Sequence, residues 1–146
     1  MNHTNRRPNP PTLLAQIGSL YTRAHRACES EFREQGFPLD FDQVPVLLSL
    51  YYSGGASQQE IYTRLSRDKA SVNRTVSFLT KKGFTTVTPD AGDRRKTIVE
   101  LSPKGKDVAK QGNVILEKYD AMLSSRLTAE ERKVLHDLIG KLNIPG

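Results

Sequence analysis

The fold follows from residues 57–83, which read SQQEIYTRLSRDKASVNRTVSFLTKKG. Ser57 and Glu60 stand at the spacing of a capping box, in which the serine hydroxyl accepts the third helical N–H and the glutamate accepts the serine N–H. This pairing predicts a short helix over residues 57–65. Ser66-Arg67 then leaves room only for a tight connection.

A second, basic helix is predicted over residues 68–83. Asp68 is a preferred N-cap residue, and Lys82-Gly83 supplies a basic last turn and a glycine for a left-handed C-cap. The apolar side chains on one side of this helix, at spacings of four and three, are Val72, Val76 and Leu79. A short helix, a tight turn and a second helix are typical of a helix-turn-helix pair.

Residues 84–101 predict a β-hairpin directly after that pair. Phe84 to Val87 and Thr97 to Leu101 alternate and are rich in β-branched residues, with a turn-rich segment between them. Three consecutive cations, Arg94 to Lys96, lie at the tip. The predicted fold class is therefore mainly α with a small β-hairpin (α+β), as a winged helix-turn-helix with flanking helices.

The flanking helices are expected at residues 12–35, 42–52, 103–125 and 128–142. Asp42 is the expected cap of the second of these helices, because Pro45 is tolerated only in a first turn. Thr128 and Glu131 repeat the capping-box spacing at the start of the last helix. Gly105 and Gly112 are expected to weaken the start of the helix that contains them.

The composition describes a globular chain. Hydrophobic residues make up 36% of the 146 residues and charged residues 26%, which suits one compact domain. No apolar stretch is long enough to span a membrane, and the polar N-terminus is unlike a secretory signal, so we expect a cytoplasmic protein that joins the nucleoid when it binds DNA. The single cysteine, Cys28, excludes an internal disulfide.

The net charge of +6 is confined to the middle of the chain. Residues 57–106 carry 11 basic and 5 acidic side chains, whereas basic and acidic residues balance in both flanks. This asymmetry favours a polyanion as the partner of the middle segment. A solvated basic face without a partner is the alternative.

The residue types of the second helix suit a double-stranded DNA major groove. Short polar side chains and asparagine or arginine in its first half can reach base edges, and later cations can neutralise phosphates. Arginines in a wing suit the negative potential of the adjacent minor groove, and Asp93 could hold one of them in position. Solvation of an outer helix face is the alternative for the helix. The predicted DNA contacts are Ser57, Lys69, Ser71, Asn73, Arg74, Ser77, Lys81, Arg94, Arg95 and Lys96.

These motifs resemble the MarR (multiple antibiotic resistance regulator) family of transcriptional regulators. The resemblance rests on Asp68 to Arg74, Lys81 to Phe84, Asp93 to Arg95 and Val99 to Gly105. Asn73 stands where that family more often has serine or threonine. The resemblance implies a homodimer that binds a pseudo-palindromic operator, most often as a repressor.

The domain prediction combines the residue pattern with this resemblance. Residues 1–11 are expected to be a flexible N-terminus and residues 12–146 a single domain. Residues 12–35 and 103–146 are the expected dimerisation helices. Residues 42–101 are the expected winged helix-turn-helix, with the first helix over 57–65, the recognition helix over 68–83 and the wing over 84–101.

The resemblance also implies a small effector, often aromatic or phenolic, in a crevice between the dimer arms and the winged lobe. Candidate contacts on the first two helices are Tyr21, His25, Cys28, Tyr51 and Tyr52, and core packing is the alternative for each. Thiol-based redox sensing through Cys28 is a second interpretation, although free cysteines on an apolar stripe are usually inert.

An enzyme is not expected from this sequence. It contains no nucleophile elbow, phosphate loop, paired-carboxylate motif or metal-ligand spacing, so neither a catalytic residue nor a metal or cofactor is predicted. A winged-helix protein-interaction module that does not bind DNA is the alternative from another class. Three adjacent wing cations argue against it, because a protein-docking wing does not need them.

Overall fold

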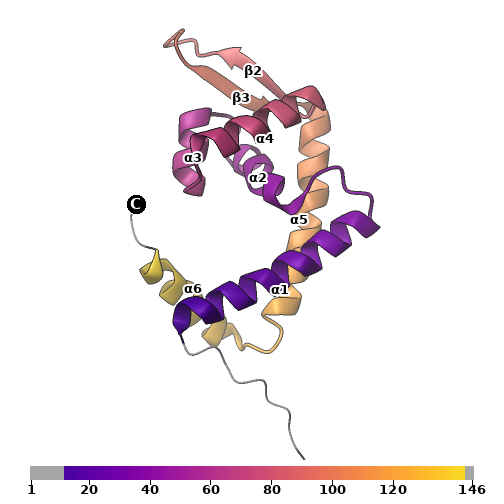
Figure 1. The fold of residues 1–146 in the computed structure, drawn as a ribbon, viewed down its shortest axis with the longest axis vertical. Helices are drawn as coiled ribbons and strands as arrows, with labels where there is room; N and C mark the ends of the chain where they lie inside the picture. The colour runs from indigo at the N-terminus through magenta and orange to yellow at the C-terminus, as the bar shows by residue number, and fades with distance from the viewer. Residues whose placement is uncertain (1–11, 144–146) are drawn as a thin grey trace, which may run out of the picture.

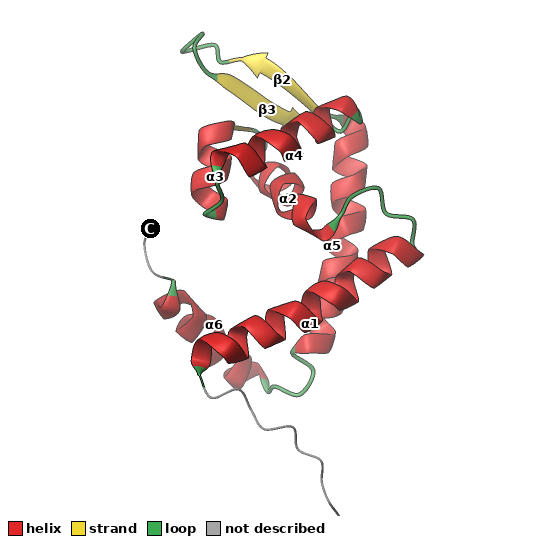
Figure 2. Cartoon of the chain, in the orientation of Figure 1, coloured by secondary structure: helices red, strands yellow, loops and turns green. Residues whose placement is uncertain are grey.

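The computed structural model describes residues 12–143, so the predicted flexible N-terminus lies outside the described residues. The elements are α1 (Leu13–Glu34), η1 (Phe41–Gln43), α2 (Val44–Ser53), β1 (Ala56–Ser57), α3 (Gln58–Leu65), α4 (Lys69–Lys81), β2 (Thr85–Pro89), β3 (Thr97–Leu101), α5 (Pro103–Leu123) and α6 (Ala129–Leu142). The predicted mainly helical fold with a small β-hairpin is confirmed (Figure 2). Helix α5 runs from the hairpin at one end of the molecule to α1 and α6 at the other (Figure 1).

The connection between α1 and α2 differs from the prediction. Asp42 does not cap a helix; it lies inside the short 3-10 helix η1, and Gln43 is the N-cap residue of α2. The side-chain oxygen of Gln43 accepts the backbone N–H of Asp40 at 3.0 Å, which satisfies a donor at the start of η1. Pro45 still lies in the first turn of α2, where its missing N–H costs nothing.

The sheet has three strands in the order β1-β3-β2, all antiparallel. Val99 of the central strand pairs with Val87 on one side and with Ala56 on the other. The sequence did not predict β1, because two residues are too few to display a strand periodicity. This third strand ties the start of α3 to the wing.

The hydrophobic core joins the winged lobe to the first part of α5. Its fully buried side chains come from α2 (Leu47), α3 (Ile61), α4 (Leu79), β3 (Val99) and α5 (Ile115). Each contributes roughly 1.5–3 kcal/mol of transfer free energy when it is removed from water. The relative placement of α4 and the hairpin is therefore set by a packed core.

Two glycines let α5 approach its neighbours closely. A Cβ on Gly105 would lie 1.9 Å from the carbonyl oxygen of Phe84, and a Cβ on Gly112 would lie 3.0 Å from Cζ of Phe37. Both glycines are buried. Glycine is a poor helix former, but at these two positions a larger residue would prevent the close packing of α5 against its neighbours.

The helices farthest from the wing expose a large apolar surface. No residue of α6 is buried, and α1 buries only Cys28 and Phe32. The exposed apolar side chains of α1 and of the end of α5 are Leu13, Leu14, Ile17, Leu20, Tyr21, Met122 and Leu123, and those of α6 are Val134, Leu135, Leu138, Ile139 and Leu142. We call these residues the apolar arms. Among residues 12–143, no helix has the length and apolar character that crossing a membrane requires.

Candidate nucleic-acid interface

Helix α4 and the wing lie at the end of the molecule opposite the apolar arms (Figure 1). The helix begins as predicted: Asp68 accepts the backbone N–H of Ser71 at 2.8 Å. The residues that anchor it to the core are Val72, Thr75, Val76 and Leu79. Only its outer face, with Lys69, Arg74 and Ser77, is exposed.

Four predicted contact residues of α4 are exposed: Lys69, Arg74, Ser77 and Lys81. Ser71 and Asn73 were also expected to be exposed, and the structure corrects this, because both are only partly accessible. The side-chain oxygen of Asn73 is buried and has no hydrogen-bond partner among the described residues. A buried carbonyl without a partner costs free energy.

Ser57 lies at the start of α3, where β1 ends. The predicted capping box is present: the Ser57 hydroxyl accepts the Glu60 N–H at 3.2 Å, and Glu60 accepts the Ser57 N–H at 2.7 Å. The hydrogen bond from the Ser57 backbone is the main cause of the lowered pKa of Glu60. A hydrogen bond from the Ser57 side chain is the second cause of that lowered pKa.

The wing tip is shaped by two aspartates. Asp93 accepts the backbone N–H of Arg95 at 3.0 Å, and Asp90 accepts that of Gly92 at 2.9 Å. Asp93 was predicted to hold one arginine in position. It contacts Arg95 through the backbone, and it forms no side-chain ion pair in the described part of the chain. Arg94, Arg95 and Lys96 are all exposed. The turn therefore presents three cations that the aspartates orient without neutralising.

Comparison with known proteins identifies this arrangement. Residues 42–97, which run from η1 to the first residue of β3, match the model of the MarR family. The chain is 29% identical over 137 residues to the HTH-type transcriptional regulator BilQ of Clostridium symbiosum, covering 88% of this chain and 92% of that protein. It is 27% identical over 135 residues to the HTH-type transcriptional repressor NicR of Pseudomonas putida, covering 91% and 85%. These matches support a regulator of the MarR family.

Solved structures share the fold of this chain. The fold matches that of E. coli MarR in complex with operator DNA, with a TM-score of 0.80 at 22% identity over 90% of this chain and 94% of that one. It also matches Bordetella bronchiseptica BpsR, whose DNA binding is regulated by 6-hydroxynicotinic acid, with a TM-score of 0.70 at 26% identity over 88% and 99%. Together with the relatives above, which are transcriptional regulators of a non-enzymatic family, these matches support a DNA-binding transcriptional regulator.

The five predicted effector contacts fall into two groups. Tyr21, His25 and Cys28 of α1 lie around Phe41, and the rings of Tyr51 and Tyr52 of α2 lie 5.3 Å apart. The rings of Tyr21 and His25 make edge-on contacts with Phe41, and His25 lies 3.6 Å from the carboxylate of Asp42. Tyr51 is half-buried against the core. The remaining two, Cys28 and Tyr52, line different pockets.

The pocket beside Cys28 lies between α1 and α5 and has a volume of about 430 Å³. Burial, followed by the negative charge of Glu29, raises the pKa of the Cys28 thiol above its usual 9.0. The thiol is therefore protonated at neutral pH, whereas a reactive sensor cysteine requires the thiolate. Within residues 12–143, no cluster of histidine, cysteine and acidic side chains could hold a metal ion.

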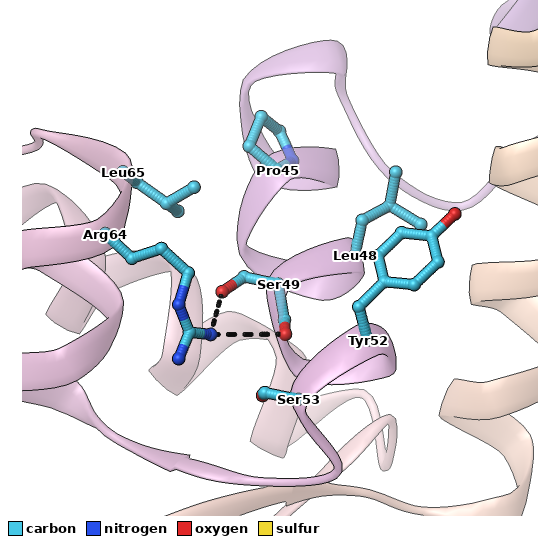
Figure 3. A pocket seen from close by; sticks show the side chains of 7 residues that line it. All are labelled: Pro45, Leu48, Ser49, Tyr52, Ser53, Arg64 and Leu65. Atoms are coloured by element: carbon cyan, nitrogen blue, oxygen red, sulfur yellow. Dashed lines mark hydrogen bonds between the residues drawn. The ribbon is translucent and has the colours of Figure 1, made fainter.

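The pocket beside Tyr52 lies between α2 and α3, and sequence reasoning did not predict it (Figure 3). Its volume is about 460 Å³. Arg64 of α3 also lines it and was not among the predicted site residues. The arginine could not be assigned from the sequence, because the pocket exists only where two helices meet.

Proposed function

We propose that this MarR-family regulator is a homodimeric repressor that binds a pseudo-palindromic operator and is released by a small organic ligand. The observation that carries the proposal is the division of the molecule into a cationic end and an apolar end. Free cations on α4 and the wing suit DNA, and the apolar arms suit a second copy of the chain.

Each predicted DNA contact has a proposed role. Lys69, Ser71, Asn73 and Arg74, in the first half of α4, read base edges, and Arg74 is the best placed for a guanine because it is exposed. Ser57, Ser77 and Lys81 contact the sugar–phosphate backbone. The wing cations, Arg94 to Lys96, follow the minor groove.

The apolar arms support the dimer and the proposed domain boundaries. Leu135 and Leu138 lie on one face of α6 with nearly half of each side chain exposed, at 45% and 49%. Apolar surface on this scale marks a protein–protein interface. Residues 12–35 and 103–146 would then dimerise, and residues 42–101 would bind DNA. Two recognition helices must lie roughly 34 Å apart to enter successive major grooves.

Repression and ligand release are proposed from two relatives. NicR is named a transcriptional repressor, and the DNA binding of BpsR is regulated by 6-hydroxynicotinic acid. We therefore expect a small organic molecule to lower the operator affinity of this chain. Redox sensing through Cys28 is a weaker alternative, since burial keeps its thiol protonated.

Selection of bound sequences from a random duplex pool tests the DNA-binding part of the proposal. An enriched inverted repeat with half-sites about one helical turn apart is the expected result. Binding to the selected site should weaken steeply between about 50 and 200 mM salt. Enrichment of single half-sites would argue against the dimer, and absence of salt-sensitive binding would argue against the proposed interface.

A reporter gene placed behind the selected site tests repression and release. Expression should fall when the protein is present and recover on addition of 6-hydroxynicotinic acid or a chemically related acid. A Cys28→Ser variant should respond like the wild type to the acid. If only peroxide relieved repression, and only through Cys28, the redox alternative would replace the ligand proposal.

A further inference from the structure

We propose that Arg67 is a positioning residue for DNA recognition: it fixes the angle between α1 and the α3–α4 pair, and thereby the half-site spacing that the dimer accepts. Arg67 lies in the turn between α3 and α4, immediately before the N-cap residue of the recognition helix. It is not among the predicted DNA contacts. The inference rests on the proposed function, because a half-site spacing has meaning only for a dimer on two half-sites.

The turn that carries Arg67 has a defined backbone. Ser66 is left-handed, with a φ of 50°, and the Arg67 N–H donates to the Tyr62 carbonyl at 3.0 Å. Asp68 follows and caps α4 by accepting the Ser71 N–H. A displacement of Arg67 therefore displaces the start of the helix that is proposed to read DNA.

The side chain of Arg67 joins this turn to η1. Its Nη1 donates to the backbone carbonyl of Asp42 at 2.5 Å. Arg67 is partly buried, and no carboxylate among residues 12–143 lies within 4.0 Å of it. A charged donor makes a stronger hydrogen bond than a neutral one. The contact thus links the start of α4 to the short segment that follows α1.

The same segment is held by α1. The Phe41 N–H donates to the carboxylate of Glu29 at 2.6 Å, and the His25 ring packs edge-on against Phe41 with centroids 4.7 Å apart. His25 Nε2 also lies 3.6 Å from the carboxylate of Asp42. Helix α1 and the α3–α4 turn therefore contact one three-residue helix.

This connection adds a second attachment to the one that α5 provides. Within residues 12–143, α1 packs mainly on α5 and η1, whereas α4 packs mainly on α3, β2 and α2. The attachment to α5 lies beyond the other end of α4, where the Ser102 N–H donates to the Phe84 carbonyl at 3.0 Å. A body held at one end can turn about that point, and a second contact at the opposite end prevents the rotation.

A direct contact of Arg67 with a DNA phosphate is the competing role, because the start of a recognition helix lies close to DNA. The two roles predict different results. Loss of a phosphate contact lowers the slope of log affinity against log salt by about 1 and weakens binding equally at every half-site spacing. Loss of a positioning contact leaves that slope unchanged and makes the protein tolerate altered spacings.

Operators of altered spacing test the proposal, with the selected half-sites moved one base pair closer together or farther apart. Each step shifts the half-sites by about 3.4 Å and rotates them by roughly 35°. We expect the wild type to bind the selected spacing at least about tenfold more tightly than either altered spacing, and Arg67→Gln to lower this ratio by about three- to tenfold. Arg67→Lys, which keeps a charged donor, should retain most of the ratio.

Arg64→Gln is the matched control. Arg64 donates to the Ser49 hydroxyl at 2.9 Å, which joins α3 to the middle of α2 and not to η1 (Figure 3). The control therefore also removes a guanidinium hydrogen bond from α3 or its following turn, but it should keep the spacing ratio of the wild type.

A distance measurement on the full chain without DNA gives a second readout. Spin labels at Arg33→Cys on α1 and Ser77→Cys on α4, both at exposed positions, report the distance between the two helices in a Cys28→Ser background. An excess of unlabelled chain restricts the signal to pairs within one chain. The distance distribution should broaden when Arg67→Gln is added and stay unchanged when Arg64→Gln is added.

Three results would overturn the assignment. An unchanged distance distribution in Arg67→Gln would show that Arg67 does not orient α4, and equal broadening in Arg64→Gln would show a general loosening instead. An unchanged spacing ratio with a salt slope lower by about 1 would assign Arg67 to a phosphate. A chain that binds no DNA, or binds only single half-sites, would refute the proposed function, while the distance measurement would still decide whether Arg67 orients α4.

Discussion

Replacement of Gly105 by alanine should destabilise the protein, although alanine is the better helix former. The new Cβ would lie 1.9 Å from the carbonyl oxygen of Phe84, where real Cβ atoms stay beyond 3.0 Å. The start of α5 must then separate from the wing by about 1 Å or more. The carbonyl cannot simply turn away, because it accepts the Ser102 N–H at 3.0 Å.

The expected loss of stability follows from two contributions that destabilise the variant and one that stabilises it. Overpacking against backbone costs about 1–3 kcal/mol, and strain on the hydrogen bonds that join Ser102 to Phe84 and to Gly83 costs about 1 kcal/mol each. Removal of glycine from a helix returns about 1 kcal/mol. We expect a net loss of roughly 2–4 kcal/mol in the free energy of unfolding.

Urea denaturation followed by far-ultraviolet circular dichroism, at one fixed protein concentration, measures this change. Gly140→Ala is the matched control, because a Cβ there meets no atom within 4 Å and Gly140 lies across α6 from Leu135. The control should gain about 0.5–1 kcal/mol. A Gly105→Ala variant as stable as the wild type would refute the argument that close approach of α5 to the wing requires glycine.

The remaining predictions concern the DNA contacts, the apolar arms and acid stability. Arg94→Ala should weaken DNA binding and lower the slope of log affinity against log salt by about 1, whereas Arg33→Ala on α1 should leave both unchanged. Asn73→Ala should change the sequence preferred in a selection from random DNA, and an unchanged preference would remove Asn73 from the reading surface. Leu138→Glu should shift sedimentation toward the monomer, and Lys133→Glu on the opposite face of α6 should not. Hydrogen bonds from Gln35 and Lys118 lower the pKa of Glu31 below its ordinary value of 4.5. The stability that these bonds contribute is therefore present at neutral pH and is lost as the pH falls through the lowered pKa. The difference in unfolding free energy between the wild type and Glu31→Gln should shrink in acid.

Local signals predicted most of the elements. The capping boxes at Ser57 and Thr128 and the Asp68 cap occur where expected, because each motif satisfies its own hydrogen bonds within a few residues. The start of α2 was predicted less well. Asp40 and Asp42 are equally good caps by residue type, and the choice depends on the 3-10 turn that leads out of α1.

The sequence alone determined the order of the elements and the separation of charge, since periodicity, caps and charge are properties of neighbouring residues. Tertiary structure decided what residues distant in the sequence do together. It turned Gly105 from a weak point of a helix into a close contact with Phe84, buried the side-chain oxygen of Asn73, and brought Arg64 to Ser49 at the edge of an apolar pocket. Packing of one element on another creates these features, and no local pattern records which atoms will meet.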